Sequence, residues 1–275
     1  MSGVGSFDLF GLSQVRFETL LLIAVRVTVM LSMVPILSAR QIPLLVRFGL
    51  GLLLTFVISR NVPTLPATLD LGQLTAAIMS QAFIGLVFGF VAFLVFTGIQ
   101  FAGEILDIQI GFAVVNIVNP ITQQQVTIVG EFELALATIL YLAADAHHYL
   151  IQGIAGSFAL VSLPYVVITY DLTHSVLGFF TQALFLVFQI AAPVAIALFL
   201  TNVGLGLMAR VAPQMNVFVV GFPLQISIGL IMLIVSLPLM GNVLPQVFAE
   251  APRQYDTILR ELAPPGQSPA PAGAR

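Results

Sequence analysis

The side chains best suited to binding a metal gather in one short stretch. Asp145, His147 and His148 lie together, and Glu131 and Glu133 come shortly before them. A helical zinc site usually carries two histidines four residues apart with a glutamate between them, and this spacing is absent here. Adjacent histidines on a helix point about 100° apart, so both cannot easily bind one ion. We therefore expect no metal site, and we interpret the stretch as a solvated or interfacial loop.

No other arrangement of residues predicts catalysis. Serines are present, but no GxSxG motif marks one as a nucleophile. All nine basic residues are arginines, and a phosphate-binding GxxxxGK[ST] loop needs a lysine. The absence of cysteine excludes disulfides, thiolate catalysis and cysteine-based metal sites. These motifs give no candidate catalytic site, and we expect no cofactor.

Isolated charges inside apolar stretches are the next candidates. Arg26 lies within the apolar stretch Thr19 to Leu37, and an ionisable residue in a membrane segment is a functional candidate by default. Alternatively, Arg26 reaches the membrane surface or pairs with an acid on a neighbouring helix. Glu104 and Asp107 are three residues apart and share one face of a helix. For Glu104 we consider solvation at a pore mouth or helix end, or an ion pair with an arginine of this chain or of a partner.

The most unusual polar segment runs from Ala102 to Gln125. Gly111 is expected to loosen its helix and Pro120 to end it. Its uncharged amides are Asn116, Asn119, Gln123, Gln124 and Gln125. Irregular backbone at membrane depth is tolerated only where it lines a cavity or is buried in protein. We therefore expect this segment at a pore, a gate or a subunit seam; the alternative is an ordinary loop outside the membrane.

Two long uncharged runs meet at Arg210. Leu172 to Ala209 and Val211 to Ala249 contain no charged residue, and each exceeds the roughly 20 residues of a membrane-spanning helix. They are predicted to form a helical hairpin with its turn at Ala209 to Asn216, where Pro213 ends the first helix. Arg210 either binds the last carbonyls of its own helix or forms a salt bridge with another subunit.

Proline and glycine inside these runs predict irregular helices. Pro193 is expected to kink the first helix, and Gly221 and Pro223 the second. Breaks are also predicted at Pro238 and Pro245.

The composition sets the fold class. The chain has 275 residues, of which 59% are hydrophobic and 8% charged, with a mean hydropathy of +1.08. A soluble domain carries roughly 25% charged residues. The net charge of −3 gives no indication of nucleic-acid binding. We predict an all-α integral membrane protein of long broken helical hairpins, with six or seven apolar segments.

Along the chain we expect a short N-terminal segment over 1–16, a helical domain over 17–250 and a disordered tail rich in proline, alanine and glycine over 251–275. Gly85 and Gly89 predict a helix contact face, as does the GLGL sequence at Gly49 to Leu52. A small-solute secondary transporter is the competing class, because broken helices and isolated intramembrane charges are typical of transporters. Against it, no matching pair of interrupted segments occurs in the two halves of the chain.

Three blocks of sequence resemble one known family. They are PILSARQIPLLVRFGLGLLLTFVI from Pro35, AGEILDIQIG from Ala102 and GLGLMARVAPQMNVFVVGFP from Gly204. They resemble the FliR family of flagellar export-gate proteins, together with the equivalent, SctT-like subunits of type III secretion injectisomes. The resemblance covers roughly Phe17 to Glu250, with the blocks in the family's order.

The resemblance implies a subunit that assembles with FliP and FliQ, then FlhB, in the bacterial inner membrane at the flagellar basal body. Such a gate passes unfolded flagellar proteins and is not an enzyme, and the subunit also contacts membrane lipid. The family's N-terminal part is similar to FliP, and its C-terminal hairpin, here about 172–250, is similar to FliQ. The injectisome counterpart is the first alternative function.

The resemblance also implies roles for single residues. The family's plug loop aligns with about Gly111 to Gln125. On this alignment, the plug residues are Gly111, Phe112, Val115, Asn116, Asn119, Pro120, Gln123, Gln124 and Gln125. The family's C-terminal motif matches Arg210, Pro213, Gln214, Gly221, Phe222 and Pro223. We interpret the motif residues, with Arg26, Glu104 and Asp107, as structural or as inter-subunit contacts.

Overall fold

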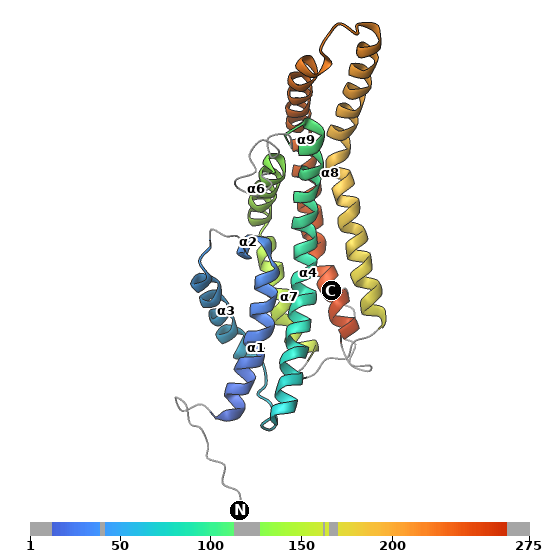
Figure 1. Cartoon of the computed structure of the whole chain (residues 1–275). Helices are drawn as coiled ribbons and strands as arrows, with labels where there is room; N and C mark the ends of the chain where they lie inside the picture. The colour runs from blue at the N-terminus through green and yellow to red at the C-terminus, as the bar shows by residue number, and fades with distance from the viewer. Residues whose placement is uncertain (1–12, 39–41, 113–126, 162, 165–169, 263–275) are drawn as a thin grey trace, which may run out of the picture. The chain divides into compact units, whose positions relative to one another are not determined.

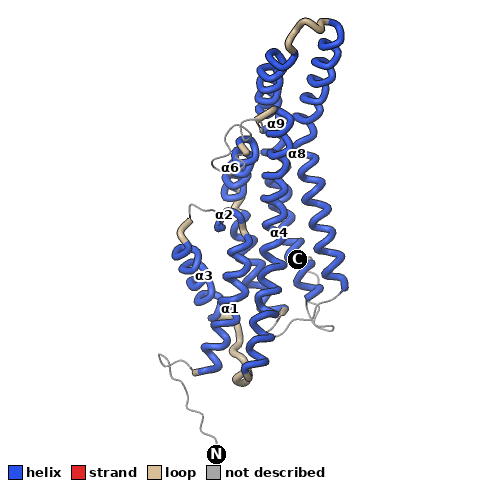
Figure 2. The backbone as a smooth tube through the Cα atoms, viewed as in Figure 1, coloured by secondary structure: helices blue, strands red, loops and turns tan. Residues whose placement is uncertain are grey.

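The computed structural model describes residues 13–38, 42–112, 127–161, 163–164 and 170–262, and every regular element among them is a helix (Figure 2). The all-α prediction is therefore confirmed. Figure 1 labels the helices of this described part, which are α1 (Gln14–Met33), α2 (Pro35–Ser38), α3 (Leu44–Ser59), α4 (Leu71–Ile110), α6 (Ile128–Ala143), α7 (Ala146–Leu160), α8 (Tyr170–Val211) and α9 (Val217–Leu262).

Three of these helices are long and apolar enough to cross a membrane. They are α4, α8 from Leu172 onward, and α9, judged by length and composition. The uncharged runs in the sequence therefore form continuous helices, as expected where backbone polar groups must bond within their own segment.

The predicted hairpin turn is confirmed. α8 ends at Val211 and α9 begins at Val217, so the turn falls within the range expected from the sequence (Figure 1). The side-chain oxygen of Asn216 accepts a hydrogen bond from the backbone N–H of Phe218 at 3.2 Å. Asparagine in this position satisfies one of the unpaired N–H groups at a helix start.

The predicted breaks in the second helix are wrong. α9 runs without interruption through Pro238 and Pro245. The helices are also continuous at Pro193, Gly221 and Pro223, where the sequence predicts kinks, and the kinks stay a prediction. Each proline removes one backbone hydrogen bond from its helix. A helix of this length keeps enough of the remaining bonds to continue on both sides.

The prediction of an unstructured tail from Ala251 is also wrong for its first part, because α9 extends to Leu262. Tyr255, Ile258, Leu259 and Leu262 are all buried. Their spacing of three, four and seven residues places them on one face of a helix. Residues 263–275 lie outside the described residues.

The chain divides into two compact units, where the sequence predicts a single helical domain over 17–250. The first comprises Met1–Phe93, His147–Phe179 and Glu250–Arg275, and the second comprises Leu94–Ala146 and Phe180–Ala249. The long helices α4, α8 and α9 therefore contribute residues to both units.

In the first unit, α1 and α4 approach closely at two glycines. A Cβ atom at Gly85 would lie 2.4 Å from the carbonyl oxygen of Arg26, and one at Gly89 would lie 2.5 Å from the Cβ of Met33. Neither position has room for a side chain. The contact face predicted from the spacing of these glycines is confirmed.

The GLGL sequence gives a contact at only one of its glycines. A Cβ at Gly51 on α3 would lie 3.1 Å from the hydroxyl oxygen of Thr28 on α1, whereas Gly49 has no such neighbour within 4 Å. The first unit also buries an aromatic pair, with the rings of Phe88 and Tyr255 stacked 5.3 Å apart. Tyr255 thus ties the last turns of α9 to α4.

In the second unit, three rings join α4, α6 and α9. The ring of Phe96 lies 5.2 Å from that of Tyr141 and 5.9 Å from that of Phe248, and the last two rings are 5.1 Å apart. The ring edges and faces meet in the stacked and perpendicular arrangements that aromatic side chains favour. This cluster packs the last turns of α6 against the interior of α4 and against α9.

Candidate functional site

The predicted gate segment begins where α4 ends. Gly111 has a φ of +98°, and its N–H and that of Phe112 both donate to the carbonyl oxygen of Asp107, at 3.1 and 3.0 Å. A residue with a side chain rarely adopts this φ, so glycine permits the chain to leave the helix here. The prediction that Gly111 loosens the helix is confirmed, while the predicted end at Pro120 lies outside the described residues.

Gly111 also contacts the C-terminal hairpin. A Cβ atom at Gly111 would lie 3.2 Å from the ring of Phe222 on α9. The sequence placed these residues in two separate groups, one in the plug and one in the C-terminal motif. The structure brings them together in the second unit.

Most of the predicted plug residues lie in a part of the chain that the structure does not describe. Of these residues, only Gly111 and Phe112 are among those that the structure describes. The others are Val115, Asn116, Asn119, Pro120, Gln123, Gln124 and Gln125, so their assignment to a gate stays a prediction.

The far side of the same segment is fixed by Asp107. Its carboxylate accepts hydrogen bonds from the backbone N–H of Val129 at 3.0 and 3.2 Å and from that of Gly130 at 3.4 Å. These N–H groups belong to the first turn of α6, where backbone donors have no partner within the helix. Asp107 therefore caps α6 from α4, and its side chain is 4% exposed.

The backbones of α4 and α6 touch beside this cap. A Cβ atom at Gly103 would lie 2.5 Å from the Cα of Gly130, and one at Gly130 would lie 3.0 Å from the carbonyl oxygen of Gln100. Two glycines facing each other allow this approach. The two helices that flank the predicted gate segment, α4 and α6, are therefore held against each other.

Glu133, one turn after Gly130, is fully buried in this joint, and neither carboxyl oxygen has a hydrogen-bond partner among the described residues. α6 is not one of the three helices long and apolar enough to cross a membrane. Burial raises the pKa of Glu133 to about 8, and the nearby charge of Asp107 adds to the rise. In the sequence, Glu133 stands out only as a possible metal ligand, although its spacing of three residues from Gly130 places both residues on one helix face.

Glu104 lies on α4 three residues before Asp107 and is half-buried. It forms no ion pair with an arginine among the described residues. Within this chain, the structure therefore gives no support to the ion pair considered for it, and a pair with a partner subunit stays a prediction.

Arg26 lies in the first unit at the centre of a neutral network. Its guanidinium donates to the side-chain oxygen of Gln81 and the hydroxyl of Ser157, both at 2.8 Å, and to the carbonyl of Val161 at 3.1 Å. It also lies 4.0 Å from the centre of the Phe158 ring. Residues of α1, α4, α7 and the turn after α7 are thus joined by one side chain.

Both alternatives considered for Arg26 within the chain are wrong. The side chain is 0% exposed, so it does not reach a membrane surface. None of the acidic side chains among the described residues pairs with it, and its partners are amide, hydroxyl, carbonyl and aromatic groups. The planar fork of arginine suits this role, since one group bonds several acceptors at fixed angles.

The remaining residues of the C-terminal motif surround the hairpin turn. Arg210 is exposed in the last turn of α8, and no hydrogen bond joins it to a carbonyl of the described chain. Pro213, Gln214 and Pro223 are exposed as well. Gly221 is buried, and a Cβ there would lie 3.3 Å from Leu205 on α8.

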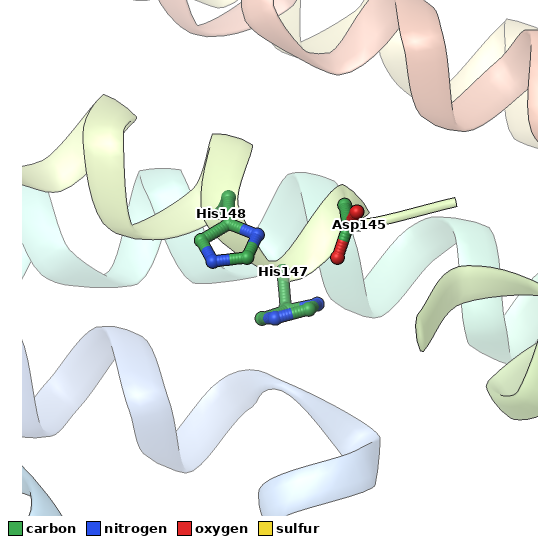
Figure 3. A group of neighbouring side chains, drawn as sticks. All are labelled: Asp145, His147 and His148. Carbon is green, nitrogen blue, oxygen red and sulfur yellow. The ribbon is translucent and has the colours of Figure 1, made fainter. Parts of the chain in front are cut away.

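Figure 3 shows Asp145 in the turn before α7, and His147 and His148 in the first turn of α7, so the two histidines do not lie in the loop that the sequence predicts. One ligand atom from each lies within 4.8 Å of the others. The two histidine side chains do not point apart as the sequence predicts, because their ring centres are 4.1 Å apart. Asp145 and His148 are exposed, and groups of this kind are common on protein surfaces without an ion.

Comparison with known proteins gives a family that spans the site. Residues 17–251 match the model of the bacterial export proteins, family 1. This range agrees with the resemblance found in the sequence blocks and contains both flanks of the predicted gate segment.

Individual relatives match over nearly the whole chain. The flagellar biosynthetic protein FliR of Bacillus subtilis (strain 168) is 31% identical over 237 residues, which is 85% of this chain and 91% of the relative. FliR of Escherichia coli (strain K12) is 30% identical over 245 residues, 86% of this chain and 91% of the relative. The Yop proteins translocation protein T of Yersinia pestis is 32% identical over 175 residues, 60% of this chain and 64% of the relative. The chain belongs to the bacterial export proteins, family 1.

Proposed function

We propose that this chain is a non-enzymatic subunit of the flagellar type III protein export gate, which passes unfolded flagellar proteins across the bacterial inner membrane. The observation that carries the proposal is the match to FliR proteins over 85% of this chain and 91% of the relative. The exported proteins are expected to contact the gate transiently.

The apolar surface of the chain supports assembly with other subunits and lipid. Large apolar side chains on α3, α8 and α9 are exposed, among them Leu45 at 84%, Phe185 at 71% and Phe218 at 76%. Exposed apolar surface on this scale usually marks contact with protein or membrane. We infer that FliP, FliQ, FlhB and membrane lipid cover it in the basal body.

Within the assembly, we propose that 172–250 is the FliQ-like hairpin and that the preceding part is FliP-like. Arg210 fits an inter-subunit contact, because it is an exposed cation at the hairpin turn without a partner among the described residues. The motif residues beside it, Pro213 and Gln214, are exposed on the same turn.

We propose that Gly111 to Gln125 forms the plug that closes the channel. The support is that the two helices that flank it, α4 and α6, are packed closely together. Asp107 and the facing glycines Gly103 and Gly130 join these helices, and the sequence between them is uncharged and rich in amides. Shortening this segment is expected to let ions leak through the assembled gate, and unchanged membrane permeability would count against the plug.

The injectisome counterpart is the second candidate, and the similarity to the Yersinia protein favours considering it. It differs from the first in partners and exported proteins. A small-solute secondary transporter is the candidate from another class. Purification from the native membrane separates the flagellar gate subunit from the transporter. A flagellar gate subunit is expected to co-purify with FliP and FliQ and to be unstable alone, whereas a transporter would be stable alone.

A further inference from the structure

Two buried acidic side chains meet at the joint between α4 and α6. Asp107 on α4 is 4% exposed and Glu133 on α6 is 0% exposed. They belong to the same unit, and each lies about one helical turn from the glycines Gly103 and Gly130, where the two backbones touch. Placing two negative charges in this joint without a cation would be very unfavourable.

The joint offers different surroundings to the two carboxyl groups. The Asp107 carboxylate accepts hydrogen bonds from the N–H groups of Val129 and Gly130 at the start of α6, where the helix dipole also favours a negative charge. Both oxygens of Glu133 lack a hydrogen-bond partner in the part of the chain that the structure describes. A single proton shared by the pair is therefore more favourable on Glu133.

No cation within the described second unit offsets the two acids. From α4 the titratable groups are Asp107 and the half-buried Glu104, and from α6 they are the exposed Glu131 and the buried Tyr141. The parts of α8 and α9 in this unit carry no titratable side chain except Arg210, at the hairpin turn. The charge that acts on Glu133 is that of Asp107, and burial raises the pKa of Glu133 to about 8.

We propose that Asp107 and Glu133 form a proton-binding site, which holds one exchangeable proton on Glu133 while α6 is packed against α4. Loss of this proton leaves two negative charges in the joint, where the backbone N–H groups of Val129 and Gly130 bind only the carboxylate of Asp107. Repulsion then weakens the contact of Gly103 with Gly130. The consequence for the gate rests on the proposed function, because this joint connects α4 and α6, the helices that flank the proposed plug.

The site is tested by infrared difference spectroscopy on the full chain, isolated from membranes together with its partner subunits. A protonated carboxylic acid has its own carbonyl stretching band, which disappears on ionisation. As the pH is raised through 8, the wild-type complex is expected to lose one such band, and Glu133→Gln is expected to lack that loss. Glu131→Gln is the matched control on the same helix, and it should keep the wild-type change. In Asp107→Asn the band should disappear at a lower pH, because the negative charge that helps to raise the pKa of Glu133 is absent.

Two results would overturn the proton site. One is a wild-type complex without the band below pH 8, which would mean that Glu133 is ionised and paired with a cation from a partner subunit. The other is a Glu133→Gln complex that shows the same loss as the wild type. Since the wild type alone can give the first result, the test does not depend on the variants folding. The spectrum reports protonation and not export. If the band titrates but the chain is not needed for flagellin export, the proton-binding site stands and the proposed function is wrong.

Discussion

The ring of Phe222 on α9 lies against Gly111 at the end of α4, 3.2 Å from where a Cβ of Gly111 would stand. The glycine combines this contact with a φ of +98°, a conformation that disfavours any side chain. The beginning of the proposed plug is therefore set by two constraints at once, one from its own backbone and one from the hairpin.

Replacing Gly111 with alanine is expected to destabilise the assembled complex by about 1–2 kcal/mol, the usual cost of a left-handed conformation for a residue with a Cβ. The measurement is the free energy of unfolding, together with ion leakage through the gate. Gly156→Ala is the control, because Gly156 lies inside α7 with no neighbour within 4 Å of an added Cβ. Equal stability of the two variants would argue against the strained position.

Replacing Arg26 with lysine should destabilise the first unit although the charge is kept. Lysine cannot bond Gln81, Ser157 and Val161 at once, and a hydrogen bond to a charged group contributes about 1.5–3 kcal/mol. We expect a loss of about 2–3 kcal/mol in stability, measured as unfolding of the purified complex and as the amount of chain in the membrane. Arg60→Lys, at an exposed position after α3, should change stability by less than about 0.5 kcal/mol. If both substitutions had the same small effect, the network would not be structural.

Replacing Gly85 with alanine should push α1 away from α4. The new Cβ would lie 2.4 Å from the backbone oxygen of Arg26, which cannot move as a side chain can. Overpacking of this kind costs roughly 1–3 kcal/mol. Gly178→Ala in α8 is the comparison, since nothing lies within 4 Å of its added Cβ. Thermal unfolding of the two variants checks the difference, and a Gly85→Ala protein as stable as the control would contradict the close packing.

The stability of the complex should depend on pH through Glu133. Its carboxyl group has an ordinary pKa of 4.5 and a folded-state pKa of about 8, so the folded chain binds more protons between these values. The free energy of unfolding therefore decreases as the pH rises from 4.5 to 8, and this contribution stays constant above 8.

Glu133→Gln removes this dependence, because glutamine keeps the shape of the protonated acid. The variant should match the wild type near pH 4.5 and unfold at a higher temperature than the wild type above pH 8. Glu131→Gln, at an exposed site on the same helix, should follow the wild type at both. A wild-type and Glu133→Gln pair with parallel pH profiles would show that Glu133 is not buried in neutral form.

The sequence predicts the long helices and their turn well, for a physical reason. Leu172 to Ala209 and Val211 to Ala249 carry no charge and must form helices in an apolar setting. The spacing of Gly85 and Gly89 likewise predicts their contact with α1. These features depend on neighbours along the chain, which a single sequence displays.

What the sequence could not predict depends on residues far apart in it. The partners of Arg26 on α4 and α7 are 55 and 131 residues away. An acid was the natural expectation for a buried arginine, and nothing local indicates Gln81 or Ser157. The proline-rich end of the chain favours disorder, so we do not predict from the sequence that α9 continues beyond Ala251. The helical spacing of Tyr255, Ile258 and Leu262, which are buried, is the signal that indicates it.

In the candidate site, too, only features that depend on neighbouring residues could be predicted. The end of the helix at Gly111 and the shared helix face of Glu104 and Asp107 are of this kind. The capping of α6 by Asp107 joins residues 22 and 23 positions apart, and the contact of Gly111 with Phe222 joins two separate helices. Such contacts depend on how the elements pack.

The central claim, that this chain is part of a flagellar export gate, is tested most directly by measuring extracellular flagellin in a strain that lacks the chain. We predict that flagellin disappears from the medium and that cells stop swimming, and that expression of the chain from a plasmid restores both. Normal export of flagellin by the deletion strain would contradict the claim. Secretion of injectisome effectors should then be assayed in the same strain.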